Sequence, residues 1–290
     1  MKKSRKLATL GICSALFLGL AACQQQHATS EGTNQRQSSS AKVPWKASYT
    51  NLNNQVSTEE VKSLLSAHLD PNSVDAFFNL VNDYNTIVGS TGLSGDFTSF
   101  THTEYDVEKI SHLWNQKKGD FVGTNCRINS YCLLKNSVTI PKLEKNDQLL
   151  FLDNDAIDKG KVFDSQDKEE FDILFSRVPT EATTDVKVHA EKMETFFSQF
   201  QFNEKARMLS VVLHDNLDGE YLFVGHVGVL VPADDGFLFV EKLTFEEPYQ
   251  AIKFASKEDC YKYLGTKYAY YTGEGLAKPF IMDNDKWVKL

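Results

Sequence analysis

Hydrophobic positions between residues 57 and 204 recur every three or four residues, which is typical of amphipathic helices. The first helix begins with a capping box at Ser57 and Glu60, whose side chains can satisfy the first backbone amides. Asp70-Pro71 separates it from a second helix that Gly89 ends, because Pro fits the first turn of a helix and Gly its end. Further helical segments are predicted over 104–117, 126–134, 171–178 and 188–202.

From Ala206 the hydrophobic period changes. Runs rich in β-branched and aromatic residues alternate with Asp, Gly and Pro, which predicts an antiparallel meander with strands over 208–213, 221–231, 237–245 and 251–254. Ser256 and Asp259 cap a last helix, and a short strand around Trp287 closes the sheet. Helices followed by strands predict one α+β domain over 46–290, helical over 57–204 and β-rich over 206–290.

The first 22 residues have the layout of a secretory signal peptide. A basic start with four Lys and Arg residues precedes an apolar run from Leu7 to Ala22 that is too short to remain as a spanning helix. The run ends in Leu20-Ala21-Ala22-Cys23, which resembles the lipobox of bacterial lipoproteins. That resemblance implies cleavage after residue 22, a diacylglyceryl group on Cys23, and a protein anchored at the outer, extracytoplasmic face of the cell membrane.

Composition and charge limit the partners of the mature chain. Residues 23–45 carry the lipidated Cys23 and few large apolar side chains, as expected of a flexible tether. Four of the 31 basic residues leave with the signal peptide, so 27 face 39 acidic ones and the net charge changes from −8 to −12. Nucleic acid binding depends on Lys and Arg. We therefore expect no nucleic-acid partner, and contact with the membrane only through the lipid on Cys23.

Three cysteines remain after Cys13 leaves with the signal peptide and Cys23 is lipidated. An odd number outside the cell leaves at least one thiol outside any disulfide, and such a thiol needs burial or a function. A bridge between Cys126 and Cys132 is not expected, because six residues of helix rise about 9 Å and bridged Cα atoms lie within about 7 Å. A bridge from either cysteine to Cys260 stays open.

Cys126 and His226 form the candidate catalytic pair. A cysteine at a helix start meets backbone amides and the positive end of the helix dipole, both of which favour the thiolate. His226 lies in a predicted strand between Gly225 and Gly228, which allow another backbone or a ligand to come close. A thiolate attacks a carbonyl carbon, and an imidazolium protonates the leaving amine.

Glu241 is the candidate third residue of the site. It shares its strand face with apolar side chains, so its carboxylate needs a polar partner. If residues 232–235 form a four-residue loop, Val231 pairs with Gly236 and Glu241 falls opposite His226. A slip of one residue would bring Lys242 there instead.

These residues resemble a family pattern. Gly123-Thr124-Asn125-Cys126-Arg127 opens a helix, and Gly225-His226-Val227-Gly228-Val229 follows on a strand, as in papain-like (NlpC/P60-type) cysteine peptidases and amidases. The resemblance implies a papain-like fold, with N-terminal helices packed on a C-terminal antiparallel sheet. It also implies Cys126 as nucleophile, His226 as base and Glu241 as the residue that orients the imidazole.

The resemblance also points to a substrate class. An amide bond, such as one in cell-wall (peptidoglycan) peptide, suits an anchored hydrolase outside the membrane. Asn125 and Arg127 beside the cysteine, and Glu at the third position, differ from the residues usual in that family. Most of the mature chain also resembles a family of Gram-positive lipoproteins of unassigned function.

Other interpretations stand beside the peptidase. A non-catalytic lipoprotein with an inert Cys126 would bind a ligand or a protein partner through its Tyr-rich surface, formed by Tyr261, Tyr263, Tyr268, Tyr270 and Tyr271. His214 is a rival base, although its surroundings predict a solvated turn. Residues 153–158 resemble a calcium loop, but Ile157 and Asp158 stand where a ligand and a glycine belong, so a solvated loop is expected. We expect no metal and no other cofactor.

Overall fold

A computed structural model of the protein describes residues 45–100 and 103–290. The signal peptide, Cys23 and the tether up to Pro44 lie outside the described residues. The helices are α1 (Gln55–Ser66), α2 (Pro71–Val88), α3 (Val107–Lys118), α4 (Cys126–Leu134), α5 (Phe151–Gly160), α6 (Ser165–Leu174), α7 (Val186–Phe197) and α8 (Lys257–Lys267). The strands are β1 (Ala47–Thr50), β2 (Thr98–Ser99), β3 (Val138–Thr139), β4 (Val178–Pro179), β5 (Gln201–Phe202), β6 (Arg207–Asp215), β7 (Tyr221–Ala233), β8 (Gly236–Lys242), β9 (Tyr249–Phe254), β10 (Phe280–Asp283) and β11 (Lys286–Val288).

Nine strands form one antiparallel sheet in the order β11-β10-β6-β7-β8-β9-β1-β2, and β4 pairs with the start of β7. The strands β6 to β9 follow one another as a meander, as the alternating pattern predicts. A separate pair joins β3 and β5. The α+β class is therefore confirmed.

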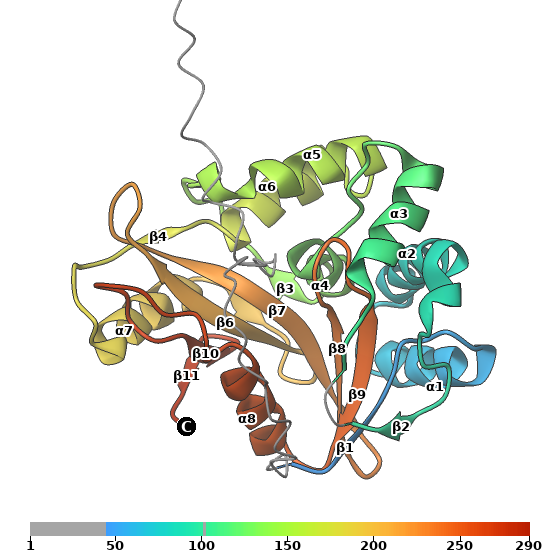
Figure 1. Ribbon diagram of the computed structural model, residues 1–290. Coiled ribbons are helices and arrows are strands. Elements are labelled where there is room, and N and C mark those ends of the chain that lie inside the picture. Colours follow the sequence, from blue (N-terminus) through green and yellow to red (C-terminus); the bar gives the residue numbers. More distant parts are fainter. Residues whose placement is uncertain (1–44, 101–102) are drawn as a thin grey trace, which may run out of the picture.

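The sheet lies between two unequal layers (Figure 1). One face packs against α1 to α7 in a large core, to which β7 contributes Val227 and Val229. The other face packs against α8 in a smaller core that includes Leu230, Phe239 and Leu264. Because side chains alternate between the faces of a strand, each central strand supplies residues to both cores.

Local capping explains where the helices begin. The first helix starts at Gln55, because the Asn54 side chain accepts a hydrogen bond from the amide of Ser57 and acts as the N-cap. The prediction of a cap at Ser57 was therefore wrong. Asp70 caps α2 and Gly89 ends it, as the sequence predicts.

The first half differs from the sequence predictions in several places. The segments predicted as helical over 171–178 and 188–202 end before β4 and β5, which take up residues 178 and 201–202. Strand β1 precedes the helices and pairs with β9, so the sheet is not confined to the second half of the domain. Residues 153–158, predicted as a solvated loop, belong to α5, where Asp153, Ala156 and Ile157 are buried. This helix was not predicted because it has few apolar positions and three acidic side chains within a short run.

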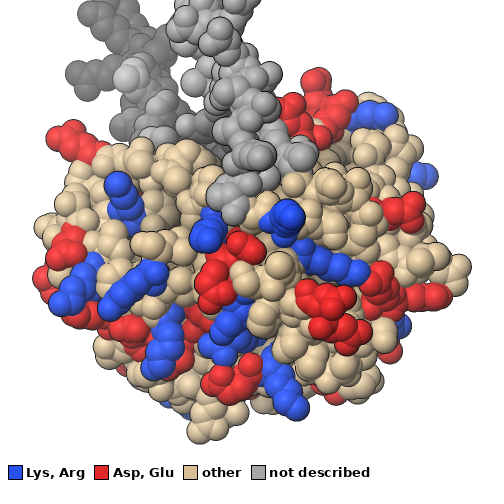
Figure 2. Space-filling view, turned by 90° about the horizontal axis from the view of Figure 1, so that it is seen from below, with Lys and Arg blue, Asp and Glu red and all other residues tan. Residues whose placement is uncertain are grey.

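Acidic and basic side chains are interspersed on the face of the molecule that Figure 2 shows, where the charges partly screen one another. Within residues 45–100 and 103–290, no helix has both the length and the apolar character needed to cross a membrane.

Candidate functional site

Helix α4 begins at Cys126 because Asn125 caps it. The Asn125 backbone is extended, and its side chain accepts a hydrogen bond from the amide of Ile128 at 3.1 Å. Cys126 therefore stands in the first turn, as predicted, and is 0% exposed. Asn129 holds this start from inside the helix, since its side-chain amide donates to the Asn125 carbonyl and to the Thr124 hydroxyl.

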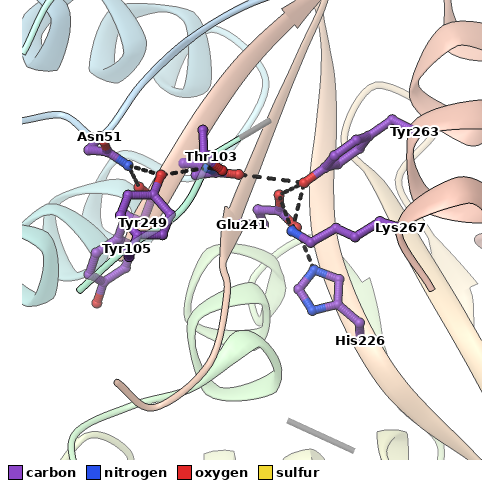
Figure 3. Close-up of polar contacts among 9 residues, drawn as sticks. Asn51, Thr103, Tyr105, His226, Glu241, Tyr249, Tyr263 and Lys267 are labelled. Atoms are coloured by element: carbon purple, nitrogen blue, oxygen red, sulfur yellow. Dashed lines mark hydrogen bonds and ion pairs between the residues drawn. The ribbon is translucent and has the colours of Figure 1, made fainter. Parts of the chain in front are cut away.

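His226 and Glu241 contact each other on the sheet face that α8 covers (Figure 3). The Nε2 atom of His226 donates to Oε2 of Glu241 at 2.5 Å, and both residues are 1% exposed. The second oxygen of Glu241 accepts from the Tyr263 hydroxyl and lies 3.5 Å from Nζ of Lys267. The Glu241 carboxylate thus has the polar partners that its burial requires.

The predicted strand register was wrong by two residues. Ala233 pairs with Gly236 and Val229 with Val240, so the hairpin loop has two residues and Glu241 does not lie directly opposite His226. A shift of two residues keeps every side chain on its face, whereas a shift of one reverses it. Glu241 and His226 therefore still share a face, as diagonal neighbours.

The sheet opens beside His226. Pairing of β7 with β8 ends at Val229, and the two strands diverge beyond it, with α4 packed against both (Figure 1). Opposite β6, the register shifts between Val211 and Val212, so Gly225 is an extra residue directly before His226. Such bulges re-aim the following side chain. The divergence of β7 from β8 and the bulge at Gly225 together explain the contact between Cys126 and His226. Cys126 belongs to a helix on one face of the sheet, whereas the His226 side chain lies on the other face.

The charges of the three groups depend on one another. Burial opposes protonation of His226, but the Cys126 sulfur, which lies within interaction distance, and the Glu241 carboxylate together raise the pKa of His226 above its usual value. Burial would raise the pKa of Glu241, yet Lys267, His226 and Tyr263 lower it to about 2. Glu241 is therefore ionised at neutral pH and fixes the proton of His226 on Nε2.

The other ring nitrogen of His226 has different surroundings. Nδ1 is buried and has no hydrogen-bond partner within the described residues. The sulfur of Cys126 interacts with this imidazole. Cys126 thus interacts with the His226 imidazole, which in turn contacts Glu241, in the predicted order.

The other two cysteines have different surroundings. None of Cys126, Cys132 and Cys260 forms a disulfide in the described part of the chain, and all three are buried. Burial raises the pKa of Cys132 to about 12 and that of Cys260 well above its usual value. Both therefore keep their protons at neutral pH and have no imidazole partner in the described structure.

Several contacts of the site were not predicted from the sequence. Tyr268, at the end of α8, stacks on the His226 ring with 4.8 Å between ring centroids. Tyr263 contacts Glu241, and its ring meets Trp45 edge-on. Lys267 follows Tyr263 by four positions on α8, so the spacing of a charge and a tyrosine on one helix face was the available signal.

The rival features lie elsewhere. His214 lies near the end of β6 and is 1% exposed, with its Nε2 2.7 Å from Glu220, whereas residues 216–219 after it form the exposed turn that the sequence predicts. Of the Tyr-rich segment, Tyr270 alone is largely exposed, while Tyr261, Tyr263 and Tyr268 are buried between α8 and the sheet. Within the described ranges, no three His, Cys, Asp or Glu side chains cluster as metal ligands would.

A cavity of about 300 Å³ adjoins the start of α4. Gly123 and Thr124, which precede Cys126 in the chain, form part of its wall, and the rings of Trp114 and Tyr249 line it as well. Cys126 does not line this cavity. A second cavity, of about 430 Å³, lies between α1 and α2 and is lined by several Asn side chains.

Comparison with known proteins gave one match. Residues 48–288 match the family model DUF4300, described as a domain of unknown function. No curated protein and no solved structure matches the chain.

Proposed function

Because the chain belongs to the DUF4300 family, whose description names no activity, we propose its function from the site itself. The protein is a membrane-anchored, extracytoplasmic lipoprotein with a papain-like thiol hydrolase site. Its substrate is an amide bond of a peptide, with cell-wall peptide as the natural source. Cys126 is the nucleophile, His226 the acid and base, and Glu241 orients the imidazole.

One observation carries the proposal, namely the contact order of Cys126, His226 and Glu241. A buried carboxylate that holds Nε2 leaves Nδ1 as the nitrogen that exchanges a proton with the thiol. The raised pKa of His226 favours an imidazolium beside a thiolate. Structural cysteines such as Cys132 lack this combination.

The reaction proceeds in two steps. The Cys126 thiolate attacks the carbonyl carbon of the amide, forming a C–S bond, and the tetrahedral intermediate expels the amine, which takes its proton from the His226 imidazolium. Water then attacks the thioester while neutral His226 accepts a proton from it. Breaking the C–S bond yields the carboxylic acid and restores the thiolate–imidazolium pair. No oxidant or metal is required.

Substrate access requires an opening, since Cys126 and His226 are at most 1% exposed. Among the residues that line this cavity, Gly123 and Thr124 are the nearest to Cys126 in the sequence. We expect the scissile bond to reach Cys126 from this cavity when the start of α4 and the facing side chains separate.

Alkylation of the native full chain tests the proposal. Iodoacetamide at neutral pH should modify Cys126 at least about tenfold faster than Cys132 and Cys260, because only Cys126 has an imidazole partner. Mass spectrometry of the proteolysed chain gives the rate at each cysteine. His226→Ala should slow modification of Cys126, whereas His214→Ala, which removes another buried histidine, should not.

Two results would overturn the peptidase. One is a Cys126 that reacts no faster than Cys132, and the other is an unchanged Cys126 rate in His226→Ala. Full burial of Cys126 favours the alternative, a non-catalytic lipoprotein that binds a ligand or a partner. In that case Cys126→Ala would change thermal stability and leave the cellular phenotype intact.

The anchor is tested separately. Cys23→Ser should remove the lipid mass from the mature N-terminus and move the protein from the membrane fraction to the soluble fraction, because the thiol accepts the lipid. Cys13→Ser, in the signal peptide, is the matched control and should leave both unchanged. Membrane retention of Cys23→Ser without lipid would contradict the lipoprotein assignment.

A further inference from the structure

The residues on either side of Cys126 are bound to the same buried carboxylate. Arg127 donates from Nε and Nη2 to the two oxygens of Asp153, at 2.9 and 2.8 Å. Asn125 donates from its side-chain amide to Oδ1 of Asp153 at 2.8 Å. Asp153 is 1% exposed and Arg127 is 9% exposed, so these contacts are shielded from water.

The same helix turn also holds strand β7 around His226. Nη1 of Arg127 donates to the carbonyl of Val224 at 3.0 Å, two residues before His226. The Ser130 hydroxyl donates to the carbonyl of Val227 at 3.2 Å, one residue after it. Helix α4 therefore binds the backbone on both sides of His226, across the bulge at Gly225.

Stability alone does not explain a buried ion pair at this position. Removing two charges from water costs free energy, and apolar side chains of the same volume often stabilise a fold at least as well. What the pair supplies is geometry, because the planar guanidinium binds both carboxylate oxygens and still has a third nitrogen for Val224. A lysine donates from a single nitrogen and cannot reproduce the planar, bidentate geometry of the guanidinium.

We propose that Arg127 and Asp153 are positioning residues that fix the Cys126 sulfur against the His226 imidazole by fastening the start of α4 to strand β7. This inference rests on the proposed function, since it concerns the same nucleophile and base. It gives a shared role to two features of the sequence. One is Arg127, which differs from the residue usual beside the cysteine of the peptidases, and the other is Asp153, which begins the acidic run. Neither residue contacts the substrate in this scheme, and both act through the two reacting groups.

The test compares Arg127→Lys and Asp153→Asn with matched controls in the full chain. Arg177→Lys changes another buried arginine paired with an aspartate, and Asp172→Asn changes another buried aspartate paired with a lysine. Within the described residues, neither control side chain makes a hydrogen bond or an ion pair to α4. The Cys126 alkylation rate is measured from pH 5 to pH 10, beside thermal unfolding.

We expect Arg127→Lys and Asp153→Asn to slow alkylation at neutral pH about tenfold or more, because a displacement of about 1 Å has effects of that order. The pH dependence that His226 imposes on the rate should weaken in both. Arg177→Lys and Asp172→Asn should keep the parent rate and pH dependence, even where they lower the unfolding temperature equally. A purely structural role of the pair would change unfolding and leave the pH dependence intact.

Failure of this inference differs from failure of the proposed function. If His226→Ala slows alkylation while Arg127→Lys and Asp153→Asn react like the parent, the positioning role is wrong and the hydrolase proposal stands. If His226→Ala has no effect, the proposed function fails first. If neither variant folds, Ser130→Ala, which removes one hydrogen bond to β7, provides the test. An alkylation rate and a pH dependence equal to those of the parent in that variant would overturn the positioning role.

Discussion

Glu241 decides the chemistry of the site at the scale of single residues. Its carboxylate is buried, yet it accepts from His226 and Tyr263 and lies beside Lys267. These partners outweigh the cost of burial and keep the pKa of Glu241 near 2. The ionised group in turn favours the protonated form of His226 and holds a proton on its Nε2 atom.

Glu241→Gln should separate charge from shape. The amide keeps the volume of the side chain but loses the charge, so the pKa of His226 should fall. The contribution of His226 protonation to the free energy of unfolding should fall with it. That stability is present below pH 6.5 and is lost as the pH rises through the raised pKa of the folded state. NMR titration of His226 measures the shift, and urea unfolding should show a loss of about 3 kcal/mol, as when one partner of a buried pair is removed.

Glu220→Gln is the matched control, because Glu220 is the carboxylate partner of another buried histidine, His214. It should leave the His226 titration unchanged. An unaltered His226 titration in Glu241→Gln would show that the carboxylate does not set the charge of the ring.

At the scale of elements, the sequence predicted the parts of the site that depend on periodicity. The helical spacing of Ile128, Tyr131 and Cys132 predicts a helix that begins near Cys126, and alternation along β7 and β8 predicts which side chains share a face. The contact between His226 and Glu241 followed from that alternation. It survived a wrong hairpin loop because an error of two residues preserves the face.

Contacts between distant elements were beyond the reach of the sequence. Asp153 lies on a helix with few apolar positions, and its pairing with Arg127 depends on how α5 packs against α4. Strand β1 was missed because four residues carry too little pattern to indicate a strand. The bulge at Gly225 depends on pairing with β6, since nothing in the sequence fixes which glycine becomes the extra residue.

At the scale of the whole molecule, the two cores bury many weak acids in their protonated form. Burial raises the pKa of Tyr105 and of Cys132 to about 12, and it raises that of Tyr263 and Cys260 well above their usual values. Both layers contribute, since Cys132 belongs to α4 and Cys260 to α8. Alkaline conditions are therefore expected to destabilise both layers of the fold.

The free energy of unfolding should fall steeply as the pH rises above 9. Unfolded cysteines and tyrosines ionise near pH 9 and 10, while their buried counterparts hold their protons. Each such group costs about 1.4 kcal/mol per pH unit until its folded pKa is reached. Urea unfolding from pH 8 to pH 11 measures this slope, which Cys132→Ala with Cys260→Ala should reduce between pH 9 and 10. A constant free energy over that range would contradict the prediction.

Under the proposed lipid anchor, the position of Trp45 has a mechanical consequence. Trp45 directly precedes the residues that lead into β1, and its ring meets Tyr263, which donates to Glu241. A pulling force on the preceding chain would act first on Trp45 and on β1, which pairs with β9 and with β2. Through the ring of Trp45, the force would reach Tyr263 and with it the carboxylate behind His226.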